Sequence, residues 1–353
     1  MDLRSLVSPQ TIDGSLASLE AKTEEPFDFQ LRALEPLLRG ATEIGYALGV
    51  ANINRQLGQV YRLQGTFEKS LFHLSEAIAY YEREHQDALL ARALLQLAAL
   101  YQAASLPMAS VEAALRASHF YERSNNTADQ AKALFLLTNV LNDAGDYEHA
   151  KEFAQNTIEL FSSLGNPQYI ALARGTLGLI HLQLGELEDA LTQTLLAYEE
   201  FEREDLKPNE AIVRNNLAEI YLKMGRGDLA ISYAGMARQI AEECGMKQFE
   251  AAVNLSVAEI YEANGSFAMA ETYYNVAITR AEDTTAFKPL ELAHQRLASL
   301  CRRLGRMEEA FEHLEASIAA RERQHEFEIS AFRGHFEALR QRLEQPKLEE
   351  ATL

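Results

Sequence analysis

Tryptophan is absent from this sequence of 353 residues, and cysteine occurs only twice, at Cys244 and Cys301. The two cysteines have no CxxC spacing, so a disulfide framework is excluded, and neither has a histidine at metal-ligand spacing. We therefore expect two reduced cysteines that serve packing, in a protein of a reducing compartment.

Positive charge and long apolar runs are also scarce. Lys and Arg number 33 against 52 Asp and Glu, which gives a formal net charge of -19. Binding to nucleic acid depends on clustered Lys and Arg, so nucleic acid is a poor partner for this surface. No run reaches the roughly 18 apolar residues that span a bilayer, and residues 1–20 show no basic segment before an apolar one. The sequence predicts a cytoplasmic protein that does not bind a membrane.

Motifs for catalysis are missing as well. The sequence contains no nucleophile with a partner base, no paired carboxylates, no Gly-rich loop after a strand and no histidines at metal-ligand spacing. Its nine histidines are scattered. We therefore predict no enzyme activity, no metal site and no cofactor.

A 40-residue repeat is the strongest pattern that is present. Seven segments align at this offset without an insertion or deletion, and the apolar content of 47% is rich in Ala and Leu, which favours helix. The first helix of each repeat (helix A) has a core column at Leu57, Leu97, Leu137, Leu177, Leu217, Val257 and Leu297. A small or short residue follows each of them, and three residues later comes Tyr61, Tyr101, Leu141, His181, Tyr221, Tyr261 or Cys301. We expect these columns to be mostly buried.

Glycine and small residues mark the turns and the second helix (helix B). Glycine recurs between the two helices of a repeat, as at Gly65 and Gly185, where a left-handed residue ends a helix. Small residues such as Ala190 and Ala197 lie two turns apart on helix B and predict a close seam with helix A. Prolines such as Pro208 predict the loops that separate successive repeats.

These columns resemble the tetratricopeptide repeat family, as in "RQLGQVYRLQGTFEKSLFHLSEAI" and "LGLIHLQLGELEDALTQTLLAY". The usual unit has 34 residues, so the repeat of 40 is similar to the long-helix subclass of kinesin light chains, MalT-like domains and bacterial peptide-sensing regulators. The resemblance implies an all-α, right-handed superhelical solenoid of helical hairpins. We expect N-terminal capping helices over 1–46, seven repeats over 47–323, a helical extension over 324–345 and a disordered tail over 346–353.

The family usually binds peptides or helices along helix A, and this implies a polar groove that holds a protein or peptide. The candidate groove residues are Asn52, Arg55, Gln59, Arg62, Arg92, Gln96, Lys132, Phe135, Asn139, Asn142, Asn215, Asn216 and Glu219. Asn139, Asn142, Asn215 and Asn216 are the strongest candidates, because a side-chain amide both donates to and accepts from a peptide backbone. Ordinary solvated helix faces would also carry such residues.

The last helix B shows no stop signal from Met307 to about Glu344. It carries a seam at Ile329, Phe332, Phe336, Leu339 and Leu343, with the spacing of a coiled coil. Either this segment folds back to cap the last repeat, or it pairs with a second chain in a homodimer.

Two functions follow from the sequence. The first is a non-catalytic scaffold or adaptor that binds a protein or peptide in the groove. The second is a ligand-responsive bacterial signalling regulator, in which the C-terminal helix transmits groove occupancy to a partner or dimer mate. Fold alone does not choose between them.

Overall fold

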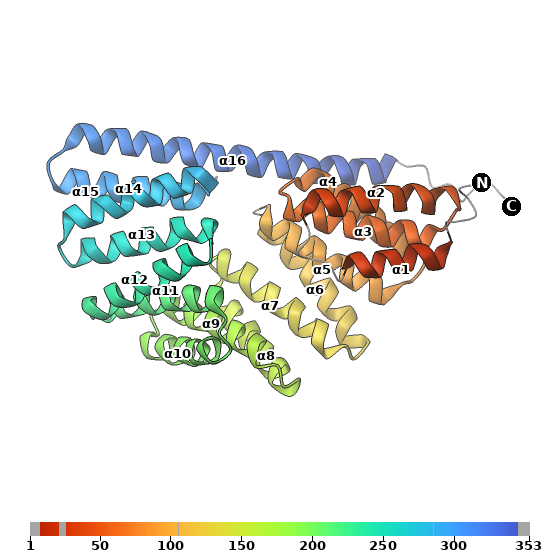
Figure 1. Ribbon diagram of the computed structural model, residues 1–353, viewed down its shortest axis with the longest axis horizontal. Coiled ribbons are helices and arrows are strands. Elements are labelled where there is room, and N and C mark those ends of the chain that lie inside the picture. The colour runs from red at the N-terminus through yellow and green to blue at the C-terminus, as the bar shows by residue number, and fades with distance from the viewer. Residues whose placement is uncertain (1–7, 21–25, 105, 285, 345–353) are drawn as a thin grey trace. The chain divides into compact units, whose positions relative to one another are not determined.

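Helix boundaries recur every 20 residues along most of the chain. The computed structural model describes residues 8–20, 26–104, 106–284 and 286–344, except for the side chains of Gln248 and of residues 327–344, and within these ranges it contains helices and turns only (Figure 1). The helices are α1 (Pro9–Glu20), α2 (Phe27–Glu43), α3 (Ala47–Leu63), α4 (Phe67–Arg83), α5 (Asp87–Ala103), α6 (Pro107–Arg123), α7 (Thr127–Asp143), α8 (Tyr147–Ser163), α9 (Pro167–Leu184), α10 (Leu187–Arg203), α11 (Lys207–Lys223), α12 (Gly227–Glu243), α13 (Lys247–Ala263), α14 (Phe267–Thr284), α15 (Phe287–Arg303) and α16 (Met307–Glu344). The predicted all-α repeat fold of tandem hairpins is confirmed.

A left-handed residue ends nearly every helix from α2 onward. Residues with positive φ lie 20 positions apart, except at positions 105 and 285, which the structure does not describe: Gly45, Gly65, His85, Asn125, Gly145, Gly165, Gly185, Asp205, Gly225, Gly245, Gly265 and Gly305. At the first intra-repeat turn, Thr66 N–H donates to the Tyr61 carbonyl at 2.9 Å and Gly65 N–H donates to Arg62 at 3.0 Å. These two bonds satisfy carbonyls that the helix end would leave open.

The prolines do not lie where the sequence pattern predicted. Pro167 is the first residue of α9 and Pro208 the second residue of α11, so each lies inside the first helical turn. A proline fits there because the first N–H groups of a helix have no intrahelical partner. Repeats are therefore separated by left-handed residues such as His85 and Asp205, and the proline starts the next helix.

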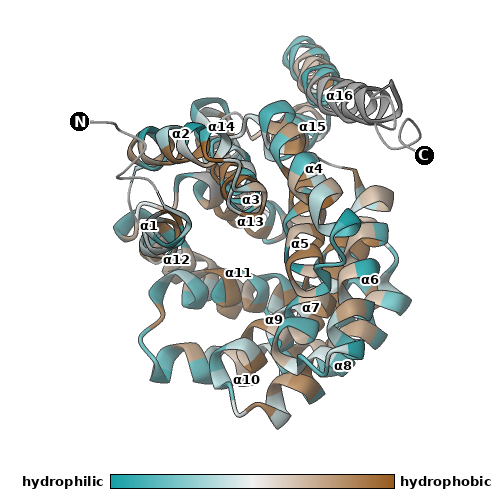
Figure 2. Cartoon of the chain, turned by 90° about the vertical axis from the view of Figure 1, so that its right-hand side faces the viewer, coloured by the Kyte–Doolittle hydropathy of each residue, from teal (hydrophilic) through white to brown (hydrophobic). Residues whose placement is uncertain are grey.

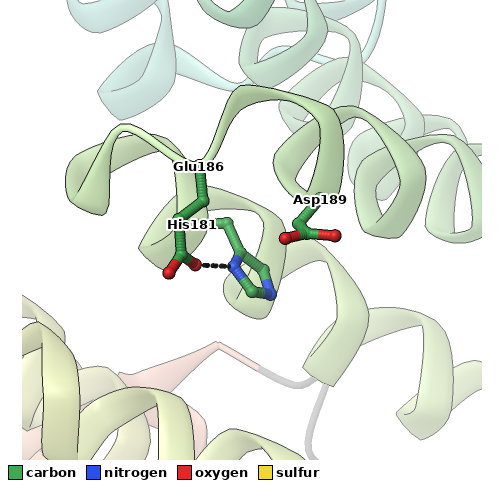
Figure 3. A group of neighbouring side chains, drawn as sticks. All are labelled: His181, Glu186 and Asp189. Atoms are coloured by element: carbon green, nitrogen blue, oxygen red, sulfur yellow. Dashed lines mark hydrogen bonds and ion pairs between the residues drawn. The ribbon is translucent and has the colours of Figure 1, made fainter.

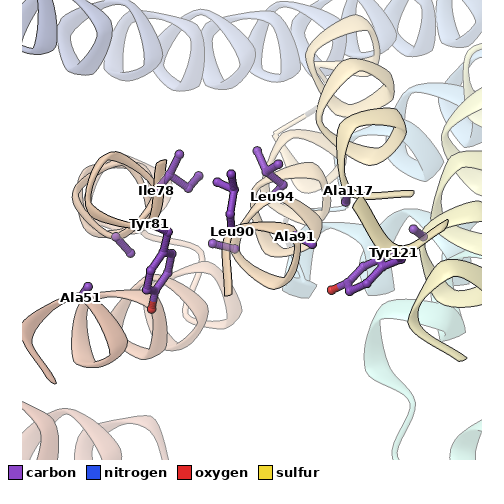
Figure 4. Packing of buried hydrophobic residues seen from close by; sticks show 11 residues of the cluster. Ala51, Ile78, Tyr81, Leu90, Ala91, Leu94, Ala117 and Tyr121 are labelled. Atoms are coloured by element: carbon purple, nitrogen blue, oxygen red, sulfur yellow. The ribbon is translucent and has the colours of Figure 1, made fainter. Parts of the chain in front are cut away.

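The chain folds as two compact units, one of Met1–Ala144 with Glu328–Leu353 and one of Gly145–Phe327. In the first unit, α3 to α7 contribute to a cluster around Tyr81, Leu94 and Tyr121 (Figure 4). In the second unit, Tyr274 and Leu297 lie in a cluster between α13, α14, α15 and the start of α16. Figure 2 shows apolar and polar residues alternating along the helices, as expected where each helix buries one face.

The predicted helix A columns are mostly buried, and Leu57 and Leu217 are at most 1% exposed. The predicted seam between helix A and helix B of a repeat is also closely packed. A Cβ at Gly58 would lie 2.6 Å from Leu74 Cγ, and the Ser70 hydroxyl donates to the Gly58 carbonyl at 2.6 Å. The small residues therefore allow helix B to approach helix A closely.

The two N-terminal helices pack on the first repeat. Ile12 of α1 and Leu34 of α2 are buried in one cluster with Ile53 and Leu57 of α3. These contacts bury apolar side chains of α3, and the capping role expected of residues 1–46 stays a prediction.

Candidate functional site

Polar side chains bridge successive A helices within each unit. In the first unit, Gln96 of α5 donates to Gln59 of α3 at 2.8 Å, and Gln102 of α5 donates to Asp143 at the end of α7 at 3.1 Å. The bonded residues are 37 or 41 positions apart, so the contacts follow the repeat register. We call this row of bonds on α3, α5 and α7 the helix A ladder.

The second unit repeats the same contacts with charged groups. Ser256 of α13 donates to Glu219 of α11 at 3.2 Å, again 37 positions apart. Arg296 of α15 donates to Glu259 of α13 at 2.7 Å. Polar side chains on these helices thus bond to one another across neighbouring A helices, and these bonds restrict their conformations.

Arg55 differs from a free groove residue. Its side chain is only 4% exposed and forms an ion pair with Glu20 at the end of α1. The neighbouring Asn52 accepts a hydrogen bond from the Tyr81 hydroxyl at 2.8 Å, and burial raises the pKa of Tyr81 to about 12. Arg55 therefore contributes to the contact between α1 and α3, and its place in a ligand groove stays a prediction.

Three buried polar atoms of the ladder region have no hydrogen-bond partner in the described part of the chain. They are Nε of Arg62, Oε1 of Gln96 and Oδ1 of Asn142, one on each of α3, α5 and α7, and Nε of Arg55 on α3 is also unpartnered although that guanidinium pairs with Glu20. Burial lowers the pKa of the Arg62 guanidinium, because the charged form loses water. Buried polar atoms in native proteins are nearly always paired, so these three atoms mark a place for a ligand or ordered water.

The remaining candidates on the first unit are less enclosed. Arg92 and Lys132 are exposed, and Lys132 donates to Asp129 at 2.9 Å on the same helix. Phe135 and Asn139 are half-buried on α7. The two half-buried residues lie on the helix that also carries Asn142, and they extend the ladder region with one apolar and one amide group.

Asn215, Asn216 and Glu219 form the candidate group of the second unit. Asn215 is buried and donates to Glu219 at 3.2 Å, while its Oδ1 has no partner among the described residues. Burial raises the pKa of the Glu219 carboxyl, even though Ser256 and Asn215 both donate to it. Asn216 is half-buried beside them. Because this group belongs to the other unit, we treat it as a separate subsite.

One group of side chains has metal-like spacing. The ligand atoms of His181, Glu186 and Asp189 lie within 4.8 Å of one another at the turn between α9 and α10 (Figure 3). The His181 ring bonds to Glu186, and Lys151 donates to the same carboxylate at 2.7 Å. The lysine already balances the charge of Glu186 and lowers its pKa, so we interpret this cluster as an ion-paired turn.

The predicted C-terminal seam lies outside the described side chains. α16 is one helix of 38 residues, more than twice the 17 residues of most other helices in the described ranges. The side chains of Ile329, Phe332, Phe336, Leu339 and Leu343 belong to residues 327–344, so their contacts remain a prediction.

Glu20, Ser256 and Asp143 are partners that the sequence pattern did not single out. The offsets of 37 and 41 could have found Ser256 and Asp143, because these spacings place residues side by side on neighbouring A helices. No repeat register covers α1, so Glu20 had no such signal.

Comparisons with known proteins agree with this architecture. Residues 209–283 and 292–324 match two family models described as tetratricopeptide repeat. No curated protein shows a similar sequence. No helix in the described ranges is long and apolar enough to cross a membrane.

Several solved structures share the fold at low sequence identity. A Rap protein complexed with Competence and Sporulation Factor is 18% identical, with a TM-score of 0.68 over 92% of this chain and 90% of that chain. The Rap conjugation gene regulator of plasmid pLS20 in complex with the Phr* peptide is 14% identical, with a TM-score of 0.65 over 90% and 96%. Aspartyl phosphate phosphatase F from Bacillus subtilis is 16% identical, with a TM-score of 0.66 over 87% and 79%. At these identities the likeness concerns the fold alone.

The two matched segments and the shared fold agree with the 20-residue helix register, and the chain therefore contains tetratricopeptide repeats over residues 209–283 and 292–324 within an all-helical repeat fold.

Proposed function

We propose that this protein is a non-catalytic cytoplasmic adaptor that binds an extended peptide segment of another protein along the helix A ladder of its first unit. The observation that carries the proposal is the set of buried, unpartnered atoms on Arg62, Gln96 and Asn142. A guanidinium N–H and two amide oxygens can bond to the carbonyl and N–H groups of a peptide backbone without selecting its side chains.

The ladder bonds support the proposal energetically. Gln59 and Gln96 hold each other at 2.8 Å, and Gln102 is held by Asp143. Side chains that are already fixed lose little conformational freedom when a ligand binds, so more of each new hydrogen bond contributes to affinity. Two structures with the same fold contain a bound factor or peptide, which fits this use of the fold.

A selection from a displayed library of random peptides, followed by titration of the selected peptides, tests the proposal. In the variant Arg62→Ala with Asn142→Ala, we expect the dissociation constant to rise at least about tenfold, because each lost bond is worth roughly 1–3 kcal/mol at a buried site. The control is Arg116→Ala with Asn156→Ala, which removes the same residue types from exposed positions on helices α6 and α8. Equal weakening by both variants would place binding elsewhere.

The continuity of α16 favours a second function, a ligand-responsive regulator. The helix that packs on α15 through Ala310 continues without a break to Glu344. A shift of the last repeat would therefore move the first half of this helix with it. Spin labels at exposed positions of α15 and α16, paired with labels on α11, test this function. A selected peptide should change the separation between the two sets of labels. An unchanged separation argues for a passive adaptor.

A further inference from the structure

The hydroxyl of Tyr121, at the end of α6, is a buried donor without an acceptor in the described part of the chain. The residue is 2% exposed, and its hydroxyl oxygen has no hydrogen-bond partner there. Phe161 and Phe201 take the same position in the next two repeats and are equally buried. Packing at this position therefore does not need a hydroxyl, and an unpaired buried hydroxyl costs stability. The hydroxyl of Tyr121 needs another explanation than packing.

The repeat register explains why this donor stays unpaired. One repeat earlier, the Tyr81 hydroxyl donates to Asn52 of α3 at 2.8 Å. The residue that corresponds to Asn52 in the next repeat is Arg92 on α5, and a guanidinium has no acceptor atom. Figure 4 shows Tyr81 and Tyr121 in the same cluster of the first unit. Where the first repeat pairs a donor with an acceptor, the second therefore places two donors.

Two arginines give this group a positive charge. Burial, followed by the charge of Asp129, raises the pKa of the Tyr121 hydroxyl, and the charges of Arg92 and Arg55 oppose this rise. Both guanidinium groups therefore lie within electrostatic range of the hydroxyl. The Arg55 side chain is 4% exposed, and its Nε has no hydrogen-bond partner among the described residues. Arg92 is exposed, so the group opens to solvent at that side chain.

The acids near this group already have partners. Asp129 of α7 accepts from Lys132 at 2.9 Å and from Asn126 at 3.0 Å. Glu20 of α1 pairs with Nη2 of Arg55 and leaves the Nε of that guanidinium unused. Because Lys132 balances Asp129 and Glu20 balances one of the two arginines, one positive charge is left without a counter-charge.

We propose that Arg55, Arg92 and Tyr121 form a binding site for an oxyanion. A carboxylate or phosphate oxygen only accepts hydrogen bonds, so it suits a group that offers only donors, and its charge balances the remaining arginine. Glu20 sets the charge that the site prefers. With Glu20 on Arg55, a singly charged carboxylate matches the site better than a doubly charged phosphate. The site lies within the first unit, and the proposal does not depend on peptide binding along the helix A ladder.

Titration of the full chain with acetate or inorganic phosphate, followed by NMR with isotope-labelled arginine, tests the site. The Nε–H resonance of Arg55, identified with an Arg55→Lys variant, should shift and saturate with acetate. Arg92→Gln should raise the acetate dissociation constant at least about tenfold, since a charge-assisted bond is lost. The control Arg116→Gln removes an exposed arginine of α6 and should leave the constant unchanged. A resonance that acetate does not saturate, or equal effects of the two variants, would overturn the proposal.

Glu20→Gln tests the charge preference. With unchanged helicity, this variant should bind both ions more tightly, because the positive charge of Arg55 is no longer balanced. At about pH 8, where phosphate is mostly doubly charged, the gain for phosphate should be roughly the square of the gain for acetate, since the Coulomb energy scales with the ligand charge. Equal gains for the two ions, or no gain, contradict the role of Glu20.

Tyr121→Phe separates a binding role of the hydroxyl from a structural one. The variant should raise the acetate dissociation constant by roughly fivefold, because one hydrogen bond to the ion is lost. It should also raise the melting temperature of the chain without added ions, because the unpaired buried hydroxyl is removed. A lower melting temperature would show that the hydroxyl has a partner in the free protein. That result, or an unchanged dissociation constant, would remove Tyr121 from the site and overturn the assignment.

Discussion

Acidification should destabilise the last repeat through His294. This histidine of α15 is buried, and its Nδ1 lies 3.1 Å from Nδ1 of His313 on α16. One nitrogen donates and the other accepts, so the contact requires both rings to be neutral or to share a single proton. Burial, followed by the charge of His313, lowers the pKa of His294 to about 4.

The magnitude follows from proton linkage. The unfolded chain binds a proton at residue 294 near pH 6.5, while the folded chain does so only near pH 4. The unfolded state therefore binds more protons in this window, and stability is lost as the pH falls through 6.5 towards 4. Between pH 7 and pH 5 this amounts to about 2 kcal/mol for the one histidine. His73 of α4, whose pKa burial also lowers to about 4, acts in the same direction.

Urea unfolding at pH 7 and pH 5 measures the effect as a double difference between the wild type and His294→Asn. Asparagine places an amide near the former Nδ1 and does not titrate. The variant should lose about 2 kcal/mol less than the wild type between the two pH values. The control is His149→Asn, because His149 is exposed on α8 and its bond to Asp146 raises its pKa. Equal losses for the wild type and His294→Asn would refute the reasoning.

Three further changes test the packing, the turns and the buried acid. Gly178→Ala should destabilise by about 1–3 kcal/mol in urea titrations, since its Cβ would lie 2.1 Å from Thr194 Oγ1, and adding Thr194→Ala should restore stability by recreating the Ala–Ala pair of the next repeat. His85→Gly should stabilise by roughly 1 kcal/mol in the same assay, because residue 85 has a φ of 51°, where glycine has no steric cost; a loss of stability would argue against a left-handed turn there. Glu219→Gln should raise the melting temperature at pH 7 and lose this advantage as the pH falls, because burial raises the pKa of the carboxyl and stability from that group declines as the pH rises through its pKa. A constant difference between Glu219→Gln and the wild type across pH would contradict this assignment.

The repeat fold could be predicted because residues close in sequence determine where each helix ends and where two helices can pack closely. Small residues at 58 and 70 permit close helix contact, and glycines such as Gly65 end helices in the left-handed region. The turns between repeats were harder to predict from the sequence, because His85 and Asp205 adopt the same positive φ although neither is a glycine. Prolines near those turns suggested loops, but in the structure they lie in the first turn of the next helix.

The candidate site was only partly predictable, for a different physical reason. Helical periodicity places Arg55 and Arg62 on one face, but it does not tell which side chain finds a partner elsewhere in the chain. Arg55 pairs with Glu20 of α1, a helix outside the repeat register, and the Nε atoms of Arg55 and Arg62 both lack a hydrogen-bond partner in the described part of the chain. Polar residues on adjacent A helices also bond to each other. Whether such a bond forms depends on the distance between the two helices more than on the sequence pattern within either helix.

Site-specific photo-cross-linking in native lysate tests the central claim most directly. A benzophenone amino acid replaces Phe135, half-buried on α7 beside the helix A ladder, or in the control Phe72, an exposed residue of helix α4. Cross-linked protein identified by mass spectrometry at position 135 and absent at position 72 is the predicted result. Cross-links from position 72 alone, or equal products from both positions, would contradict binding along the helix A ladder.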